Sequence, residues 1–121
     1  MKYILKNFID CSEKELDEIL SWRNDYQVRK NSFNQGIIER QDHFNYVETL
    51  KNRVDRAYFL VQDENNIPYG VISFLNISKD FAEVGYYKAK NRENEKGIGK
   101  ILLDIASSVA KDGSEIGVRG G

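Results

Sequence analysis

The sequence predicts a single α+β domain in which helices flank a mainly antiparallel sheet, in the order β-α-α-β-β-β-α. Residues 13 to 30 and 39 to 53 carry apolar side chains at helical spacing, and this spacing returns over residues 97 to 111. Between them, residues 57 to 88 hold short apolar runs separated by turn residues, a pattern typical of a β meander. A chain of 121 residues has room for one modest core.

The first part of the chain is predicted to form a strand and a long helix. Lys2 to Ile9 is short, apolar-rich and compatible with a strand. Ser12 and Glu15 have the spacing of a capping box, so a helix is expected from Glu13 to about Lys30. Residues 31 to 36 break the helical pattern and predict a loop.

A second helix and the meander follow. The helix is expected over about Glu39 to Arg53. Its predicted buried stripe consists of apolar residues at helical spacing: Phe44, Val47, Leu50 and Val54. The strands are expected at Ala57–Gln62, Ile67–Ile77 and Phe81–Lys88. Pro68 cannot donate a hydrogen bond to a neighbouring strand, so it should lie at a strand start or on an edge.

A charged loop, Lys90 to Lys96, leads into a third helix over Gly97 to Lys111. The apolar face of this helix is predicted to comprise Ile98, Ile101, Leu102, Ile105 and Val109. Residues 112 to 121 contain four glycines and few residues suited to a core. We therefore expect a domain over residues 1 to 111, followed by a tail that is either non-native or one weak strand.

The composition excludes several classes of function. With 18 basic and 19 acidic residues the net charge is −1, so no nucleic-acid partner is expected. One cysteine and one histidine, Cys11 and His43, cannot complete a structural zinc site, so no metal is expected. A lone cysteine fits a reducing compartment, and no apolar run approaches the roughly 20 residues that span a bilayer. A cytoplasmic protein without a membrane partner is therefore expected.

A glycine-rich helix start is the most informative segment. Gly97 and Gly99 have no side chains, so a phosphate group can approach the backbone closely there. Unpaired N–H groups and the helix dipole favour an anion at such a start, and Lys96 and Lys100 are expected at its rim. The motif alone leaves two readings open, an anion site and a helix start without a ligand.

This segment resembles the defining segment of the GNAT acetyltransferases, (Arg/Gln)-x-x-Gly-x-(Gly/Ala) after a strand. Here it reads Asn94-Glu95-Lys96-Gly97-Ile98-Gly99, with Asn94 where the family has Arg or Gln. The predicted order of elements is also that of the family, so the resemblance spans about residues 2 to 111. It implies that acetyl-CoA binds here as the cosubstrate. The implied cofactor-binding residues are Gly85, Tyr86, Tyr87, Asn94, Lys96, Gly97, Ile98, Gly99 and Lys100.

The segment Trp22-Arg23-Asn24-Asp25 resembles the signature of two GNAT groups. One group is the sugar-nucleotide N-acetyltransferases of pseudaminic-acid-type biosynthesis, and the other is the ribosomal-protein alanine N-acetyltransferases. The acceptor implied is a primary amine, on an amino-sugar nucleotide or a protein N-terminal alanine, with the sugar slightly favoured. Arg23, Asn24 and His43 are candidate acceptor-site residues. A salt bridge or cap is the alternative for Arg23 and Asn24, and a packed or surface position is the alternative for His43.

In the implied reaction, the amine attacks the acetyl thioester directly. A backbone N–H of the strand segment around Tyr86 is expected to stabilise the tetrahedral oxyanion. Glu83 on the same strand is the candidate base, acting directly or through water, if partial burial raises its pKa. The alternative for Glu83 is an ordinary strand glutamate that faces solvent.

The tyrosine that protonates coenzyme A in many GNAT relatives lies in a later helix, after the position of Lys111. We therefore expect this chain to hold a partial GNAT fold without its C-terminal strands and helix, and to be inactive alone. The strand at residues 81 to 88 would then be an open edge, which predicts a homodimer or masking by residues 115 to 118. Two other classes stay open: an acyl-CoA-binding module and a protein-interaction domain without catalysis.

Overall fold

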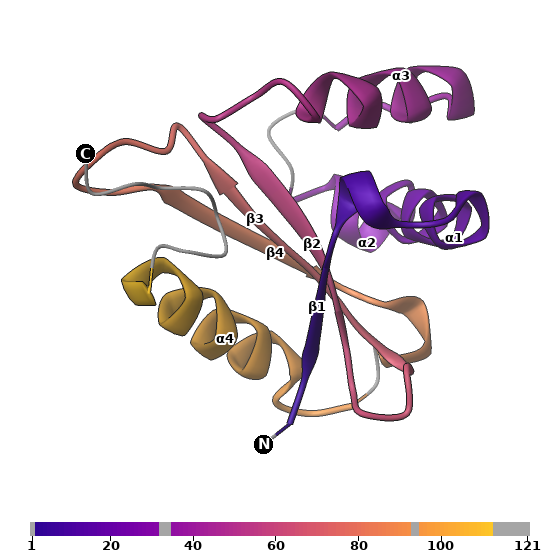
Figure 1. Ribbon diagram of the computed structural model, residues 1–121. Helices are drawn as coiled ribbons and strands as arrows, with labels where there is room; N and C mark the ends of the chain where they lie inside the picture. Colours follow the sequence, from indigo (N-terminus) through magenta and orange to yellow (C-terminus); the bar gives the residue numbers. More distant parts are fainter. Residues whose placement is uncertain (1, 32–34, 93–94, 113–121) are drawn as a thin grey trace.

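The computed structural model describes residues 2–31, 35–92 and 95–112 (Figure 1). It confirms the α+β class and the antiparallel sheet, whose strands lie in the order β1-β2-β3-β4. The strands are β1 (Ile4–Asn7), β2 (Ala57–Gln62), β3 (Pro68–Leu75) and β4 (Glu83–Lys88). The helices are α1 (Glu13–Arg23), α2 (Tyr26–Arg29), α3 (Arg40–Leu50) and α4 (Ile98–Asp112), with short 3-10 turns at Phe8–Asp10 and Lys90–Arg92.

The sheet separates two layers of helices. Helices α1, α2 and α3 cover one face and α4 covers the other (Figure 1). Alternation along β2 divides its side chains between the layers, because Phe59 and Val61 pack with α4 whereas Leu60 packs with α1 and α3. The predicted apolar face of α4 is confirmed, since Ile98, Leu102, Ile105 and Val109 are buried and Ile101 packs against them. None of the helices in the described residues is long and apolar enough to span a bilayer.

The predicted continuous helix from Glu13 to Lys30 is wrong, although its capping box of Ser12 and Glu15 is confirmed. The helix breaks at Asp25, whose backbone is extended and whose carboxylate accepts the N–H of Gln27 at 2.9 Å, so that α2 starts anew. The Asn24 side chain bonds both backbone groups of Ile38, each at 2.8 Å. The end of α1 is therefore fixed by a segment 14 residues away.

The predicted buried stripe of the second helix is partly wrong. Helix α3 ends at Leu50, so Val54 lies beyond it and is 83% exposed. His43 and Val47 supply the buried face with Leu50, and Phe44 is partly buried against them. The apolar count missed His43 because a neutral imidazole can be buried in a place that a hydrophobic pattern assigns to an aliphatic residue.

The outer strands are shorter than predicted. Strand β1 stops at Asn7, whose side chain accepts the N–H of Ile9 and starts a 3-10 turn. Strand β4 starts at Glu83 and not at Phe81, because the hydroxyl of Ser78 accepts the Phe81 N–H at 3.2 Å and holds a turn. Pro68 begins β3, as predicted. Predictions about Asn94 and residues 113 to 121 lie outside the described part of the chain.

Candidate cofactor and acceptor site

The first turn of α4 presents free backbone N–H groups. The carbonyl of Gly97 accepts the N–H of Ile101 at 2.9 Å, which is the first bond of the helix. The amides of Ile98, Gly99 and Lys100 therefore precede the intrahelical ladder. Within the described residues, no group accepts a hydrogen bond from these amides. The turn thus has the donors and the positive dipole end that an anion needs.

The charges at this turn are modest and exposed. Lys96 faces solvent, and Lys100 forms an ion pair with Asp104 at 3.0 Å in which both side chains are mostly exposed. Such a surface ion pair contributes little to the free energy of unfolding. An anion that binds at this turn can therefore replace Asp104 as the partner of the Lys100 ammonium at a small cost in free energy. The backbone of Gly97 has φ of +84°, a left-handed conformation that glycine adopts without strain.

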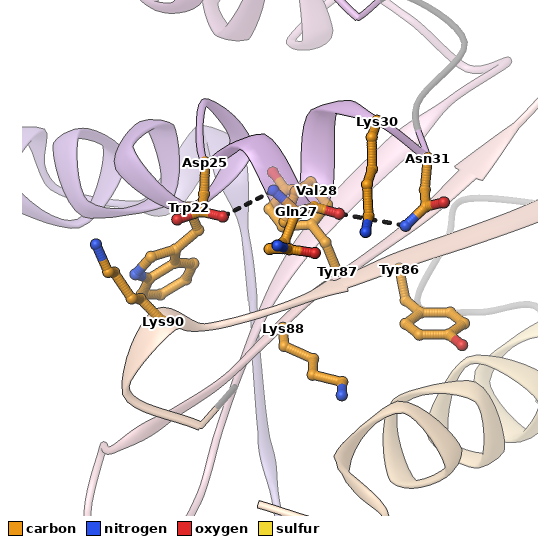
Figure 2. Close-up of a pocket in the computed structure, with 10 residues that line it drawn as sticks. All are labelled: Trp22, Asp25, Gln27, Val28, Lys30, Asn31, Tyr86, Tyr87, Lys88 and Lys90. Atoms are coloured by element: carbon orange, nitrogen blue, oxygen red, sulfur yellow. Dashed lines mark hydrogen bonds between the residues drawn. The ribbon is translucent and has the colours of Figure 1, made fainter. Parts of the chain in front are cut away.

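Gly99 brings the first turn of α4 against β4. A Cβ atom at Gly99 would lie 3.3 Å from the ring of Tyr86, so the glycine permits a close approach. Figure 2 shows the Tyr86 side chain directed toward α4, whereas Tyr87 is directed toward α1 and α2. These neighbouring tyrosines lie on opposite faces of the sheet: Tyr86 is 45% exposed and Tyr87 packs in the core.

Strand β4 is the open edge of the described sheet. One hydrogen bond shows which of its backbone N–H and C=O groups point toward β3 and which point outward. The N–H of Ala89 donates to the carbonyl of Tyr69 on β3 at 3.0 Å. In an antiparallel ladder these groups alternate between the two sides of a strand. The N–H and C=O of Tyr87 therefore point toward β3, and those of Tyr86 and Lys88 point outward. Unpaired donors from β4 thus lie beside the glycine turn of α4.

A cleft of about 670 Å³ lies on the other side of this strand end (Figure 2). Its lining comes from α1, α2 and β4: Trp22, Asp25, Gln27, Val28, Lys30, Asn31, Tyr86, Tyr87, Lys88 and Lys90. The lysines outnumber the aspartate, and the Asp25 carboxylate is engaged as the cap of α2. Burial raises the pKa of Tyr87, and nearby Tyr58 raises it further, so its hydroxyl stays neutral. The cleft therefore combines aromatic surface with a net positive lining.

Arg23 and Asn24 do not line this cleft themselves. Asn24 is occupied with the backbone of Ile38, so the structure gives it the role of a tether. The Arg23 guanidinium lies near Tyr58 and Tyr87, where its charge opposes the rise that burial imposes on the pKa of each phenol. The Trp-Arg-Asn-Asp segment does reach the cleft, through Trp22 and Asp25.

His43 lies away from the cleft, in the interface between α1 and α3. It is 7% exposed and contacts the rings of Phe8 and Phe44, with centroids 6.5 and 5.9 Å away. Burial lowers the pKa of His43, while the Leu16 carbonyl and Asp17 partly offset this shift. A neutral, packed histidine is the result, and the structure places it among core residues.

Glu83 lies at the start of β4, where it is exposed and accepts a hydrogen bond from the Asn76 amide at 2.6 Å. Alternation puts its side chain on the same face as Tyr87, toward the helices that form the cleft. Four residues of strand separate the two, which corresponds to about 13 Å. Glu83 therefore faces the acceptor side of the sheet without lining the cleft.

Sequence reasoning missed the part of the cleft that comes from α2, since it assigned this segment to the end of a longer helix. Gln27, Val28 and Lys30 face β4 only because the chain turns at Asp25. The signal was present: an Asn-Asp pair is a favoured helix end followed by a favoured N-cap. Lys88 and Lys90 were read as strand end and charged loop, with no indication that they approach α2.

Known proteins resemble this chain in sequence and in fold. No model of a known protein family matches the chain. The chain is 36% identical over 101 residues to the acetyltransferase PseH of Campylobacter jejuni, an alignment that covers 83% of the chain and 60% of that relative. It therefore spans well under two thirds of the length of its curated relative.

Solved structures show the same fold. The structure of C. jejuni N-acetyltransferase PseH in complex with acetyl coenzyme A is 26% identical, with a TM-score of 0.70, and 96% of this chain and 71% of that chain are covered. A GNAT family acetyltransferase from Staphylococcus aureus is 16% identical with a TM-score of 0.64, covering 93% and 80%. This second likeness concerns the fold alone. The chain is therefore similar to PseH in its sequence, and it shares the fold of the GNAT acetyltransferases.

Proposed function

We propose that this chain carries the cofactor-binding part of an acetyl-CoA-dependent N-acetyltransferase that acts on a primary amine. The proposal rests on two sets of backbone N–H donors that lie beside each other, one at the start of α4 and one on the open edge of β4. The amides of Ile98 to Lys100 open α4, and the outward amides of Tyr86 and Lys88 lie on the adjacent strand edge. The similar protein PseH was solved in complex with acetyl coenzyme A.

The two donor sets suit different parts of the cofactor. The first turn of α4 would hold the diphosphate, because its N–H groups and dipole favour negative charge and the glycines leave room for it. Lys96 and Lys100 would add charge at the rim. The pantetheine arm carries amide groups, which would bond the outward N–H and C=O groups of Tyr86 and Lys88 as an added strand does.

The chemistry is a direct acetyl transfer. The amine nitrogen attacks the thioester carbon, the C–N bond forms, and the carbonyl oxygen becomes an oxyanion that the Tyr86 N–H would stabilise. Glu83 would take the amine proton through a chain of water molecules, because about 13 Å of strand separates its position from that of Tyr87. The C–S bond then breaks, and the thiolate takes up a proton. We place this reaction in the cytoplasm, since Cys11 as the sole cysteine of the chain fits a reducing compartment.

The cleft supports an anionic acceptor. Lys30, Lys88 and Lys90 line it against Asp25 alone, and an amino-sugar nucleotide carries the phosphate charge that such a lining attracts. Tyr86 also lines the cleft and is 45% exposed, so its ring offers aromatic surface to a ligand. A protein N-terminal alanine, the other acceptor considered, carries no negative charge that would require these lysines.

Thermal unfolding with ligand tests the cofactor assignment. At about 100 times its dissociation constant, acetyl-CoA should stabilise the chain by about 2.7 kcal/mol, because it binds the folded state alone. Adenosine is the matched control, since it has no diphosphate. An unchanged melting temperature at millimolar acetyl-CoA would contradict the proposal and favour an interaction domain. Binding without acetyl transfer in the full-length protein would favour an acyl-CoA-binding module.

We further propose that two copies of the chain pair through the open edge of β4 when no cofactor is bound. Val84 and Tyr86 expose apolar side chains along this edge, at 39% and 45%. The outward N–H and C=O groups of one β4 would bond those of the β4 in the second copy. This pairing places Tyr86 of one copy opposite Tyr86 of the other, as a two-fold interface requires. Sedimentation should show a dimer that coenzyme A and the Val84→Lys substitution both dissociate. A monomer at every concentration, or a dimer indifferent to coenzyme A, would rule this out.

A further inference from the structure

One cation of the connection between β4 and α4 is buried where the others are exposed. The Arg92 side chain is 14% exposed, whereas Lys90 and Lys96 face solvent. Its guanidinium carbon lies 4.5 Å from the centre of the Tyr69 ring. A charged loop residue without a structural role is normally exposed to solvent. The burial of Arg92 therefore indicates a specific role.

Arg92 uses all three nitrogens of its guanidinium, two to bind the connection between β2 and β3 and one to bind Glu95. Its Nε donates to the carbonyl of Pro68 at 3.1 Å, and one terminal nitrogen donates to the carboxylate of Asp63 at 2.9 Å. The other terminal nitrogen donates to Glu95 at 3.2 Å. This division requires a planar fork of donors, which arginine has and lysine lacks.

The anchor at the far end is rigid. The Asp63 carboxylate accepts the N–H groups of Asn65 and Ile67 at 2.8 and 3.0 Å, and the Asp63 N–H donates to the Ile67 carbonyl. The backbone hydrogen bond from Ile67 is the main cause that holds the pKa of Asp63 below its ordinary value. The carboxylate therefore stays charged and fixed for Arg92.

The near end leads directly to the glycine turn. The Arg92 N–H donates to the Ala89 carbonyl at 2.9 Å, which holds it to the end of β4. The Glu95 N–H donates to the Arg92 carbonyl at 3.0 Å, and the Glu95 side chain accepts from the guanidinium. Gly97 follows Glu95 by two residues. Arg92 thus connects the sheet to the segment that enters α4.

We propose that Arg92 is a positioning residue: it holds the first-turn amides of α4 at the distance from the β4 edge that one cofactor molecule spans. This inference rests on the proposed function. It makes the turn around Asp63, which would not itself touch the cofactor, part of the cofactor site. Misplacement by a fraction of an ångström weakens binding that depends on several amides at once.

Titration of coenzyme A into the whole chain, followed by calorimetry and by amide NMR, tests the inference. Arg92→Lys should bind coenzyme A roughly tenfold more weakly than wild type, because lysine keeps the charge and loses the fork. Asp63→Asn should reproduce this loss, since the asparagine oxygen still accepts the turn N–H groups while its amide faces Arg92. Both variants should move the Gly97 and Gly99 amide signals before ligand is added. Arg53→Lys, the matched change at the exposed Arg53–Asp55 pair, should do neither.

The combined Arg92→Lys and Asp63→Asn variant should lose no more affinity than either single variant, because both remove one link. Affinity within twofold of wild type for Arg92→Lys, with unmoved glycine amide signals, would overturn the inference. Fully additive losses in the combined variant would overturn it as well. Coenzyme A binding by wild type that leaves the first turn of α4 unperturbed would instead overturn the proposed function.

Discussion

Replacing Gly70 by alanine is expected to destabilise the chain by about 3 kcal/mol or more. A Cβ atom at this position would overlap the carbonyl oxygen of Tyr87 and lie 3.0 Å from Leu102. The first obstacle is backbone of β4 and cannot move aside as a side chain can. The backbone of Gly70 also has φ of +154°, which a side chain disfavours. Urea unfolding followed by circular dichroism measures the loss.

The Gly97→Ala substitution separates the cost of steric overlap from the cost of a positive φ. Gly97 also has positive φ, +84°, but nothing lies within 4 Å of the position that its Cβ would take. Its substitution should therefore cost only the conformational part, about 1 kcal/mol. Equal losses for the two variants would show that the close approach of β3, β4 and α4 at Gly70 contributes nothing to stability.

Glu83→Gln is expected to lower the turnover number of the full-length protein by about 100-fold at neutral pH, if Glu83 is the base. Glutamine keeps the size and can still accept the hydrogen bond that the Asn76 amide donates. It cannot take a proton, so the reaction would lose its general base. The affinity for acetyl-CoA should be unchanged, because Glu83 lies far along β4 from the glycine turn.

Glu18→Gln is the matched control, since Glu18 is an exposed glutamate of α1, outside the proposed sites. It should leave turnover and its pH dependence at the wild-type level. A Glu83→Gln enzyme with at least half of the wild-type turnover would assign the proton to another group, and the residue would then be an ordinary strand glutamate.

Elements defined by local patterns could be predicted from the sequence. The capping box of Ser12 and Glu15 appears as expected, because both partners lie within one turn. Strand β2 has its predicted bounds, Ala57–Gln62, since a continuous apolar run between turn signals leaves little freedom. The apolar face of α4 follows from its spacing in the same way.

Features that depend on distant partners could not be predicted. The Asn-Asp pair favours a helix end, but the hydrogen bonds between Asn24 and Ile38 that hold this end are long-range, and no helical periodicity contains them. Arg92 looked like one more charge in a loop, because its partners Asp63 and Pro68 lie 29 and 24 residues earlier. Likewise, the cleft required α2 and the end of β4 to come together in space.

The cofactor site itself was predicted from two glycines and a resemblance, and the structure adds the neighbouring strand edge. Gly97 and Gly99 predict a helix start with room for a phosphate, and this prediction needs only the sequence. The outward direction of the Tyr86 amide depends on the register between β3 and β4, which a sequence pattern does not fix. We propose that the chain holds acetyl-CoA through these two sets of donors together.

Amide NMR during a titration with coenzyme A tests this account most directly. The signals of Ile98, Gly99 and Lys100 should shift together with that of Tyr86, and all should follow one binding curve. The amide of Val47, in the buried part of α3, should stay in place. Saturable binding that moves none of the three α4 amides, or no binding at millimolar coenzyme A, would contradict the assignment of the α4 turn as the diphosphate site.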